Sequence, residues 1–318
     1  MPATGLEEAA ATLRSGGLVA FPTETVYGLG ANALDATAVA GIFRAKRRPS
    51  FDPLIVHLAG AADAARLTSL PPSAAALAAR FWPGPLTLVL PRPRDIPGIV
   101  TSGLDTVAVR VPDHVVAREL LLRAGVPVAA PSANRFGRLS PTTADHVRTD
   151  LDGEVDVIVD GGPTRWGVES TVVDARGDRP VVLRLGALTV EDIEAAVGAV
   201  EVRRGSDGRP ATPGALPSHY APGAPLRLAT AGHPPPADRG TRACLAFRTV
   251  PPGYAAGEAL SPDGNLVTAA ARLFEALHRL DAATRERGLV GIVAEPLPEE
   301  GLGRAVNDRL RRAAAAQD

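Results

Sequence analysis

The sequence predicts a protein of two α/β (α+β) domains, the larger of which is built on an open, twisted mixed sheet. Three observations lead to this prediction. The 318 residues exceed what one hydrophobic core usually organises. Apolar runs of strand length are mixed with segments of helical periodicity, without a strict β-α repeat. From residue 203 to 225 the sequence becomes rich in proline and glycine (RRGSDGRPATPGALPSHYAPGAP), which is typical of an extended linker.

The first domain is expected over 1–205. It begins with a helix over 5–15, because Thr4 and Glu7 have capping-box spacing and two glycines follow the apolar period. A buried strand over 18–21 then runs into Pro22. Further strands are predicted from short apolar runs, and helices from amphipathic stretches. The strands are expected at 53–58, 86–91, 107–111, 126–130, 155–159, 170–174 and 181–185, and the helices at 36–45, 61–67, 72–81, 114–124, 142–149 and 189–197.

A linker over 206–225 leads to the smaller α/β domain, expected over 226–318. Apolar runs predict strands in this domain at 226–230, 242–248 and 290–295. Two longer amphipathic stretches predict helices near 266–286 and 302–315. About 90 residues suffice for a modest core of their own.

Composition excludes several classes of protein. Hydrophobic residues make up 45% and charged residues 22%, which is ordinary for a globular chain. The formal net charge of −1 provides no global positive field for nucleic acid. The single cysteine, Cys244, excludes an internal disulfide framework and a multi-cysteine metal site. No signal peptide and no apolar stretch of membrane-spanning length is visible, so we expect a cytoplasmic protein without a membrane partner.

Four polar clusters are the candidates for chemistry, and three follow or begin a predicted strand, where open α/β sheets place their sites. The first is PTETVYG, residues 22–28, and the second is KRRP, residues 46–49. The third is PSAN, residues 131–134, with Ser140 shortly after it. The fourth is EST, residues 169–171. Each alone is equally typical of turns, helix caps or a solvated helix end.

Lys46 stands out because it is the only lysine beside 33 arginines. A lysine kept against such a drift towards arginine indicates a place that needs a compact ammonium rather than a planar fork. Charged residues inside apolar runs are also informative. Arg110 in VAVRVP would be explained by a carboxylate partner. Arg184 in VVLRLG points either to solvent or into a ligand site, and a lone strand arginine is more often on the surface. A single histidine such as His57 is more often structural than catalytic.

Taken together and in this order, the motifs are specific. The strings FPTETVYGLG, KRRP, PLIVH, WPGPLTLVL, VAVRVP, PSAN and ESTVV resemble the YrdC-like threonylcarbamoyl-AMP synthases over residues 6–205. The strings SHYAP and EPLPEEGLGRAVNDRLRRAA resemble the longer, two-domain form of that family. The resemblance implies an open α/β fold around a large concave site. It also implies a reaction of L-threonine, bicarbonate and ATP that gives L-threonylcarbamoyl-adenylate and pyrophosphate. The product serves N6-threonylcarbamoyladenosine formation at position 37 of tRNA.

The resemblance also implies roles for individual residues. Threonine would be held by the side chains of Thr25, His57, Arg110 and Ser170 and by the backbone at Ala130. ATP would be contacted by Lys46, Arg48, Asp52, Thr106, Ser132, Asn134, Ser140, Arg184 and Tyr220. Lys46 and Arg48 would be the catalytic cations. Asp52 departs from the family's pattern, which often has asparagine there, and an acidic residue near ATP needs a reason.

The expected chemistry is positioning and charge neutralisation, because no residue is an obvious covalent nucleophile. Mg²⁺ is expected to arrive with the triphosphate, and no protein-held metal is expected. A closed compartment would protect the carbamate, and we hypothesise that the linker closes it through Tyr220. Two alternatives stay open. One is a carbamoyltransferase with the same domain, although its zinc-finger segment is excluded by the single cysteine. The other is an RNA-binding module. A downstream threonylcarbamoyl transferase is a possible partner, and direct tRNA binding stays undecided.

Overall fold

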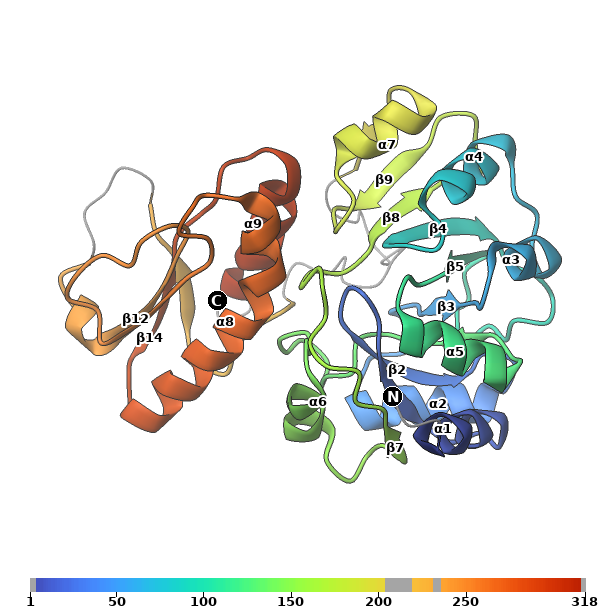
Figure 1. Cartoon of the computed structure of the whole chain (residues 1–318), viewed down its shortest axis with the longest axis horizontal. Coiled ribbons are helices and arrows are strands. Elements are labelled where there is room, and N and C mark those ends of the chain that lie inside the picture. Colours follow the sequence, from blue (N-terminus) through green and yellow to red (C-terminus); the bar gives the residue numbers. More distant parts are fainter. Residues whose placement is uncertain (1–3, 204–218, 231–235, 316–318) are drawn as a thin grey trace. The chain divides into compact units, whose positions relative to one another are not determined.

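The computed structural model describes residues 4–203, 219–230 and 236–315, and they form two compact units (Figure 1). The first unit contains residues 4–136, 141–165 and 169–203. The second contains everything described from His219 onwards, together with two short segments of the N-terminal half, 137–140 and 166–168. No sequence pattern predicted that these two segments join the second unit. Most of the expected linker, up to residue 218, lies outside the described residues.

The elements of the first unit match the predicted order closely. Its helices are α1 (Thr4–Arg14), α2 (Ala36–Lys46), α3 (Ala61–Leu67), α4 (Pro72–Phe81), α5 (Val115–Ala124), α6 (Ala144–Leu151) and α7 (Val190–Val197). Its strands are β1 (Val19–Pro22), β2 (Tyr27–Asn32), β3 (Ile55–His57), β4 (Leu86–Pro91), β5 (Thr106–Arg110), β6 (Val128–Ala129), β7 (Val157–Ile158), β8 (Thr171–Asp174), β9 (Val181–Arg184) and β10 (Glu201–Val202). The predicted mixed α/β fold is therefore confirmed.

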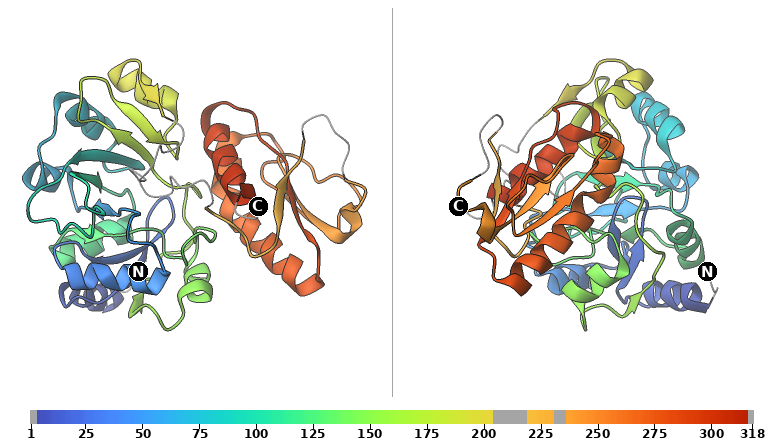
Figure 2. Two further views of the ribbon diagram at one scale, coloured as in Figure 1. Left: turned by 180° about the vertical axis from the view of Figure 1, so that it is seen from behind. Right: turned by 60° about the vertical axis from the view of Figure 1, so that its left-hand side comes forward.

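The strands form one sheet in the order β10-β9-β8-β4-β5-β3-β6-β2-β1-β7, with parallel and antiparallel neighbours. Alternate side chains of a strand point to opposite faces. On one face, α1 and α5 pack over Val19, Phe21 and Val128. On the other face, α2, α4, α6 and α7 share a larger core with residues such as Val56 and Val109. Figures 1 and 2 show these helices around the sheet.

The first of these faces continues over strands β8, β4, β5 and β3, where the site residues lie. There Ile55, Val89, Ala108 and Val172 form a small apolar cluster, and within the described residues no helix contributes to it. Because side chains two apart in a strand share a face, this cluster places His57, Thr87, Arg110 and Ser170 on the same face. These four polar side chains therefore lie beside the small apolar cluster on one face of the sheet.

Strand β2 is the main element that the sequence analysis missed. Its sequence, YGLGAN, contains two glycines, which usually weaken a strand, and no strand was predicted there. The structure explains Gly30: a Cβ there would lie 2.8 Å from both the Phe21 ring and the Val128 side chain. Glycine therefore serves close packing rather than a turn, and β2 pairs with β1 and β6.

The second unit is a parallel sheet in the order β11-β14-β12-β13, flanked by the helices α8 (Leu266–Arg287) and α9 (Gly301–Ala314). The strands are β11 (Leu226–Leu228), β12 (Arg242–Ala246), β13 (Ala256–Ala259) and β14 (Gly291–Ala294), with a short 3₁₀ turn η1 (Arg239–Thr241) before β12. Strand β13 was not predicted, because AGEA carries too few apolar residues. None of the helices in the described part of the chain has the length and apolarity to span a bilayer.

Candidate active site

Arg110 and Glu24 form the centre of the polar group. Arg110 ends β5, and Glu24 lies in the turn between β1 and β2. The Arg110 Nη2 atom is 2.7 Å from Glu24 Oε1, and the two side chains are only 4% and 2% exposed. The carboxylate partner expected for Arg110 is thus present. No described residue gives either Glu24 oxygen, or Arg110 Nε and Nη2, a well-aligned hydrogen bond. A buried pair with this much unused hydrogen-bonding capacity is typical of a ligand site.

His57 lies beside this pair. In the sheet register it is opposite Arg110, and its ring meets the edge of the Phe21 ring at 6.2 Å between centroids. Burial, together with the nearby Arg110 guanidinium, lowers the pKa of His57 to about 3. The imidazole is therefore neutral at physiological pH. It therefore brings no positive charge to the site.

Ser170, Thr87 and Arg184 form a buried cluster joined by hydrogen bonds. The hydroxyls of Thr87 and Ser170 are 2.8 Å apart, and Thr87 is opposite Arg110 in the sheet. Arg184 Nη2 donates to the carbonyl oxygen of Ser170 at 2.8 Å and to its hydroxyl at 3.1 Å. A register shift between Val172 and its neighbour accompanies the pairing with Arg184, as bulges near sites often do. The surface interpretation of Arg184 is wrong, because the side chain is buried.

Thr25 and Ala130 complete the part of the site next to Arg110. The buried Thr25 hydroxyl lies 2.9 Å from the hydroxyl of Thr23, which in turn donates to the carbonyl oxygen of Val26 at 2.7 Å. These bonds shape the PTET turn that carries Glu24. Ala130 follows β6, and its amide donates to the carbonyl oxygen of Ile55 on β3 at 2.9 Å. The turn and the strand end are therefore fixed by bonds of their own.

Lys46 is almost fully buried at the end of α2, and its ammonium meets the PSAN loop. Nζ lies 2.5 Å from the carbonyl oxygens of Ser132 and Asn134, and 3.5 Å from the side-chain oxygen of Asn134. The carbonyl of Lys46 also accepts from the amide of Phe136 at 2.9 Å. Burial and the nearby Arg48 guanidinium lower the pKa of Lys46 well below its usual range. A compact amine fits this space between carbonyls, as the lone lysine indicated.

Arg48 and Asp52 lie together on the segment that follows Lys46. Arg48 Nη2 is 2.8 Å from Asp52 Oδ2 and 2.9 Å from the carbonyl oxygen of Pro53. The guanidinium also lies 5.7 Å from the centre of the Phe136 ring. Burial raises the pKa of Asp52, while Arg48, Lys46 and Arg184 act in the opposite direction. An acidic residue at position 52 therefore has a structural explanation, because it pairs with the guanidinium of Arg48.

With this geometry in place, the comparisons with known proteins become informative. The Sua5/YciO/YrdC family model, described as telomere recombination, matches residues 11–186, and the model described as the C-terminal domain of threonylcarbamoyl-AMP synthase matches residues 188–315. The chain belongs to this family. A threonylcarbamoyl-AMP synthase of Bacillus subtilis is 44% identical, with 98% of this chain and 93% of that protein covered. The crystal structure of Pyrococcus abyssi Sua5 complexed with L-threonine is 41% identical, with a TM-score of 0.88 over 98% of this chain and 94% of that one.

A more distant solved structure shares the fold. Full-length HypF in a phosphate- and nucleotide-bound form is 19% identical, with a TM-score of 0.51 over 58% of this chain and 29% of that chain. At this identity the likeness shows a shared fold alone. Both family models of Sua5, in contrast, are matched along this chain.

Two of the predicted ATP contacts of this Sua5 family member fall in the second unit. Ser140 is buried there, and its carbonyl oxygen lies 3.1 Å from His278 Nε2 on α8. The Tyr220 ring is also buried, 5.3 Å from the Arg309 guanidinium and 5.7 Å from the centre of the Phe274 ring. Both residues are thus anchored by the helices of the C-terminal domain.

The remaining predicted residues belong to the first unit. Thr106 begins β5 and is half-buried, and Ser132 bridges to Gly28 beside the PTET turn. Asn134 is buried against Lys46, and its Nδ2 donates to the carbonyl oxygen of Arg135 at 2.9 Å. The predicted residues of this unit thus fall into two groups. One surrounds Arg110 and includes Ser170, to which Arg184 donates, and the other surrounds Lys46 and Arg48.

Sequence reasoning gave no role to Glu24 or Thr87. Glu24 stood in a cluster that had been singled out, yet nothing in the sequence connects it to Arg110, which is distant along the chain. Thr87 lies inside the apolar run LTLVL, where a threonine is an ordinary strand residue. The only signal that could have found it is the alternation that places it on the face of Arg110.

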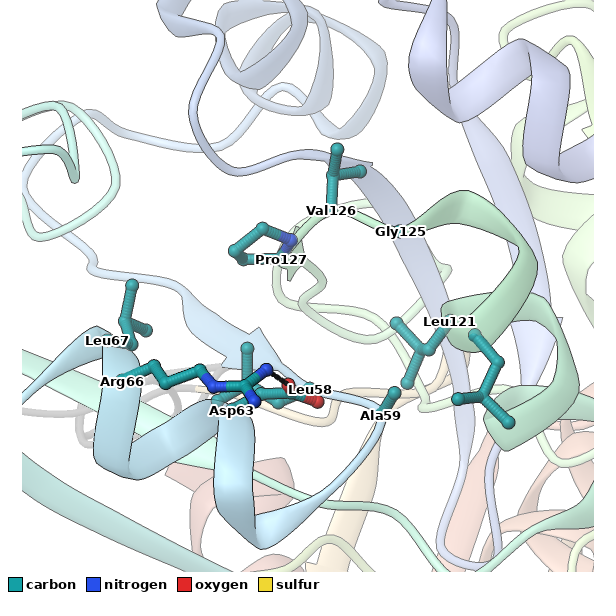
Figure 3. A pocket seen from close by; sticks show the side chains of 10 residues that line it. Leu58, Ala59, Asp63, Arg66, Leu67, Leu121, Gly125, Val126 and Pro127 are labelled. Atoms are coloured by element: carbon teal, nitrogen blue, oxygen red, sulfur yellow. Dashed lines mark ion pairs between the residues drawn. The ribbon is translucent and has the colours of Figure 1, made fainter.

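Figure 3 shows a separate pocket of the first unit, with a volume of about 360 Å³, between α3 and α5. Leu67, Leu121 and Pro127 line it, and its charged residues, Asp63 and Arg66, are paired at 3.7 Å. No predicted site residue lies in its lining. A mostly apolar pocket of this kind does not suit the charged substrates that the buried ion pairs indicate.

Proposed function

We propose that this chain is an L-threonylcarbamoyladenylate synthase, a nucleotidyltransferase that joins L-threonine, bicarbonate and ATP and releases pyrophosphate. One observation carries the proposal. A buried guanidinium–carboxylate pair with unused hydrogen-bonding capacity lies in the same compact unit as the buried basic side chains Lys46, Arg48 and Arg184, and Arg184 donates to Ser170 on the sheet face of that pair. An amino acid suits the first group, the Arg110–Glu24 pair and its neighbours. A triphosphate suits the second group, the basic side chains and their neighbours.

Threonine binds in the first group. Arg110 pairs with its carboxylate, while His57, Ser170 and Thr25 surround the rest of the molecule. Because His57 is neutral, Arg110 is the cation that meets the carboxylate. The backbone at Ala130 borders the same place.

ATP enters with Mg²⁺ on its phosphates and binds in the second group. Arg48 and Arg184 neutralise phosphate charge, with Thr106, Ser132 and Asn134 as polar contacts. The family resemblance also assigns Ser140 and Tyr220 to ATP. Lys46 holds the PSAN loop through the carbonyl oxygens of Ser132 and Asn134. The amine of threonine attacks the carbon of bicarbonate, and a carbamate forms with loss of water. The carbamate then attacks the α-phosphorus in line with the departing pyrophosphate. Pyrophosphate leaves with Mg²⁺. Catalysis comes from positioning and charge neutralisation.

The product is a reactive mixed anhydride, so a second enzyme must consume it soon after release. We propose that a threonylcarbamoyl transferase in the cytoplasm does so on tRNA, and that this chain need not hold the tRNA itself.

The test is a pyrophosphate-release assay on the full chain with ATP, Mg²⁺, bicarbonate and L-threonine, each omitted in turn. We expect release to require all four, and the adenylate to be found by mass spectrometry. If ATP is hydrolysed at the same rate without threonine or bicarbonate, the proposal is wrong. Carbamoyl phosphate and RNA would then be the ligands to test for the two alternative functions.

A further inference from the structure

Glu24 has a chemical capacity that the roles described so far do not use. Its carboxylate is 2% exposed, Arg110 Nη2 approaches it at 2.7 Å, and His114 interacts with it electrostatically. That approach lacks the alignment of a hydrogen bond, and both carboxylate oxygens have none from the described residues. Buried oxygens in native proteins nearly always have a donor, and a missing donor for a charged group is costly.

The missing donor must be cationic or polar, and it must fit beside Arg110. Arg110 has unused donors of its own at Nε and Nη2. The pair thus offers a carboxylate that can accept hydrogen bonds and a guanidinium that can donate them, within one ion-pair distance. An α-amino acid has the complementary arrangement, because its ammonium and carboxylate are separated by a single carbon. A ligand with only one of the two charges would leave half of the pair unsatisfied.

We propose that Glu24 is a catalytic residue that binds the α-ammonium of the amino-acid substrate and accepts a proton from it. The inference rests on the proposed function, in which this nitrogen must become a nucleophile. An ammonium has no lone pair, so it must lose a proton before it can attack carbon. Glu24 lies in a turn fixed by the Thr23 hydroxyl, which holds a carboxylate in place beside that nitrogen.

The step balances as follows. A bond forms between the nitrogen and the carbon of bicarbonate, and the bond from that carbon to the bicarbonate hydroxyl breaks. The nitrogen loses two protons. One leaves with the hydroxyl as water, and the other stays on the Glu24 carboxylate until solvent removes it. The products are the carbamate, one water molecule and protonated Glu24, and no oxidant or reductant takes part.

The first test compares two ligands on the wild-type chain by calorimetry: L-threonine and 3-hydroxybutanoate, which keeps the carboxylate and hydroxyl but lacks the ammonium. A charge-assisted hydrogen bond predicts a preference for threonine of roughly 10-fold or more. Equal affinities would overturn the proposal. Glu24→Gln should then lose at least about 10-fold in affinity for threonine while its affinity for 3-hydroxybutanoate is kept or rises. If both ligands are weakened equally, Glu24 only holds Arg110 and the proposal is wrong.

The second test concerns the proton. At saturating threonine, kcat of Glu24→Gln should stay roughly 100-fold or more below wild type, the usual contribution of a general base. Recovery of kcat would overturn the proton-accepting role. Glu24→Asp, which keeps the charge, should retain more activity and serves for both tests if the glutamine variant does not fold. Glu119→Gln is the control, since it removes a carboxylate 2.7 Å from Arg123 on the surface. A wild-type chain without threonine-dependent turnover would instead refute the proposed function.

Discussion

Replacing Lys46 tests whether its nitrogen holds the PSAN loop. Lys46→Met keeps the length of the side chain and removes its donors. The two carbonyl oxygens at 2.5 Å, one buried and one partly buried, would then lose this partner. Each such loss costs about 1–3 kcal/mol, so we expect the free energy of unfolding to fall by about 2–6 kcal/mol. We expect a loss near the lower end of this range, because burying the amine already costs free energy, as the lowered pKa of Lys46 indicates.

Lys46→Arg should fold but lose most activity. A planar guanidinium cannot place one nitrogen between both carbonyls, and its extra volume must be accommodated where the side chain is 1% exposed. A shift of about 1 Å in the loop that carries Ser132 and Asn134 would lower turnover by roughly 100-fold.

The assay measures urea unfolding and pyrophosphate release, with the exposed Arg44→Met in the same helix as a control. If Lys46 acts through the loop, stability and kcat fall together. A Lys46→Met variant with wild-type stability and a raised KM for ATP alone would refute that reasoning and favour direct phosphate contact. Full activity of Lys46→Arg would refute the argument from the lone lysine as well.

Three further predictions follow from the geometry. The folded-state pKa of His57 lies near 3, below its ordinary 6.5, so its contribution to stability is complete above pH 6.5 and is lost as the pH falls towards 3. Urea unfolding from pH 7 to 4 should show a shallower acid loss for His57→Gln, by up to about 1.4 kcal/mol per pH unit, and parallel curves would contradict this. Thr87→Val should cost about 1 kcal/mol and raise the KM for threonine, while Thr87→Ser restores both, because the hydroxyl meets Ser170 at 2.8 Å. If the valine variant matches wild type in KM, Thr87 is not part of the site. Arg309→Met should lower the stability of the second unit by about 2–4 kcal/mol in calorimetry, since the guanidinium is fully buried over the Tyr220 ring. The exposed Arg311→Met should have little effect, and equal losses from both would contradict the role of burial.

The sequence could predict those features that depend on local pattern. Strands β4, β5 and β8 were expected within a residue or two, because their apolar runs are long enough to be distinctive. Arg110 was recognised as a cation in need of a carboxylate, and Lys46 as a site for a compact amine, from the chemistry of the residues alone.

Other features depend on which segments the fold brings together, and no local pattern carries that information. Glu24 meets Arg110 because the turn after β1 and the end of β5 share one face of the sheet. Strand β2 packs Gly30 closely against Phe21 of β1, and Val128 of β6 lies equally close. From its strand alone Arg184 was expected on the surface, and only the family resemblance implied a ligand contact; the carbonyl and hydroxyl of Ser170 give it a buried partner.

The two buried ion pairs share a property that links stability to function. Glu24–Arg110 and Arg48–Asp52 approach to 2.7 and 2.8 Å, yet all four carboxylate oxygens lack a well-aligned hydrogen bond within the described residues. Removing two charges from water is costly, and attraction offsets this cost only when geometry and hydrogen bonding are good. The ligand-free protein therefore holds both pairs at a cost. A ligand that supplies the missing hydrogen bonds recovers that cost as binding free energy. The same pairs that lower the stability of the fold would therefore raise its affinity for substrate.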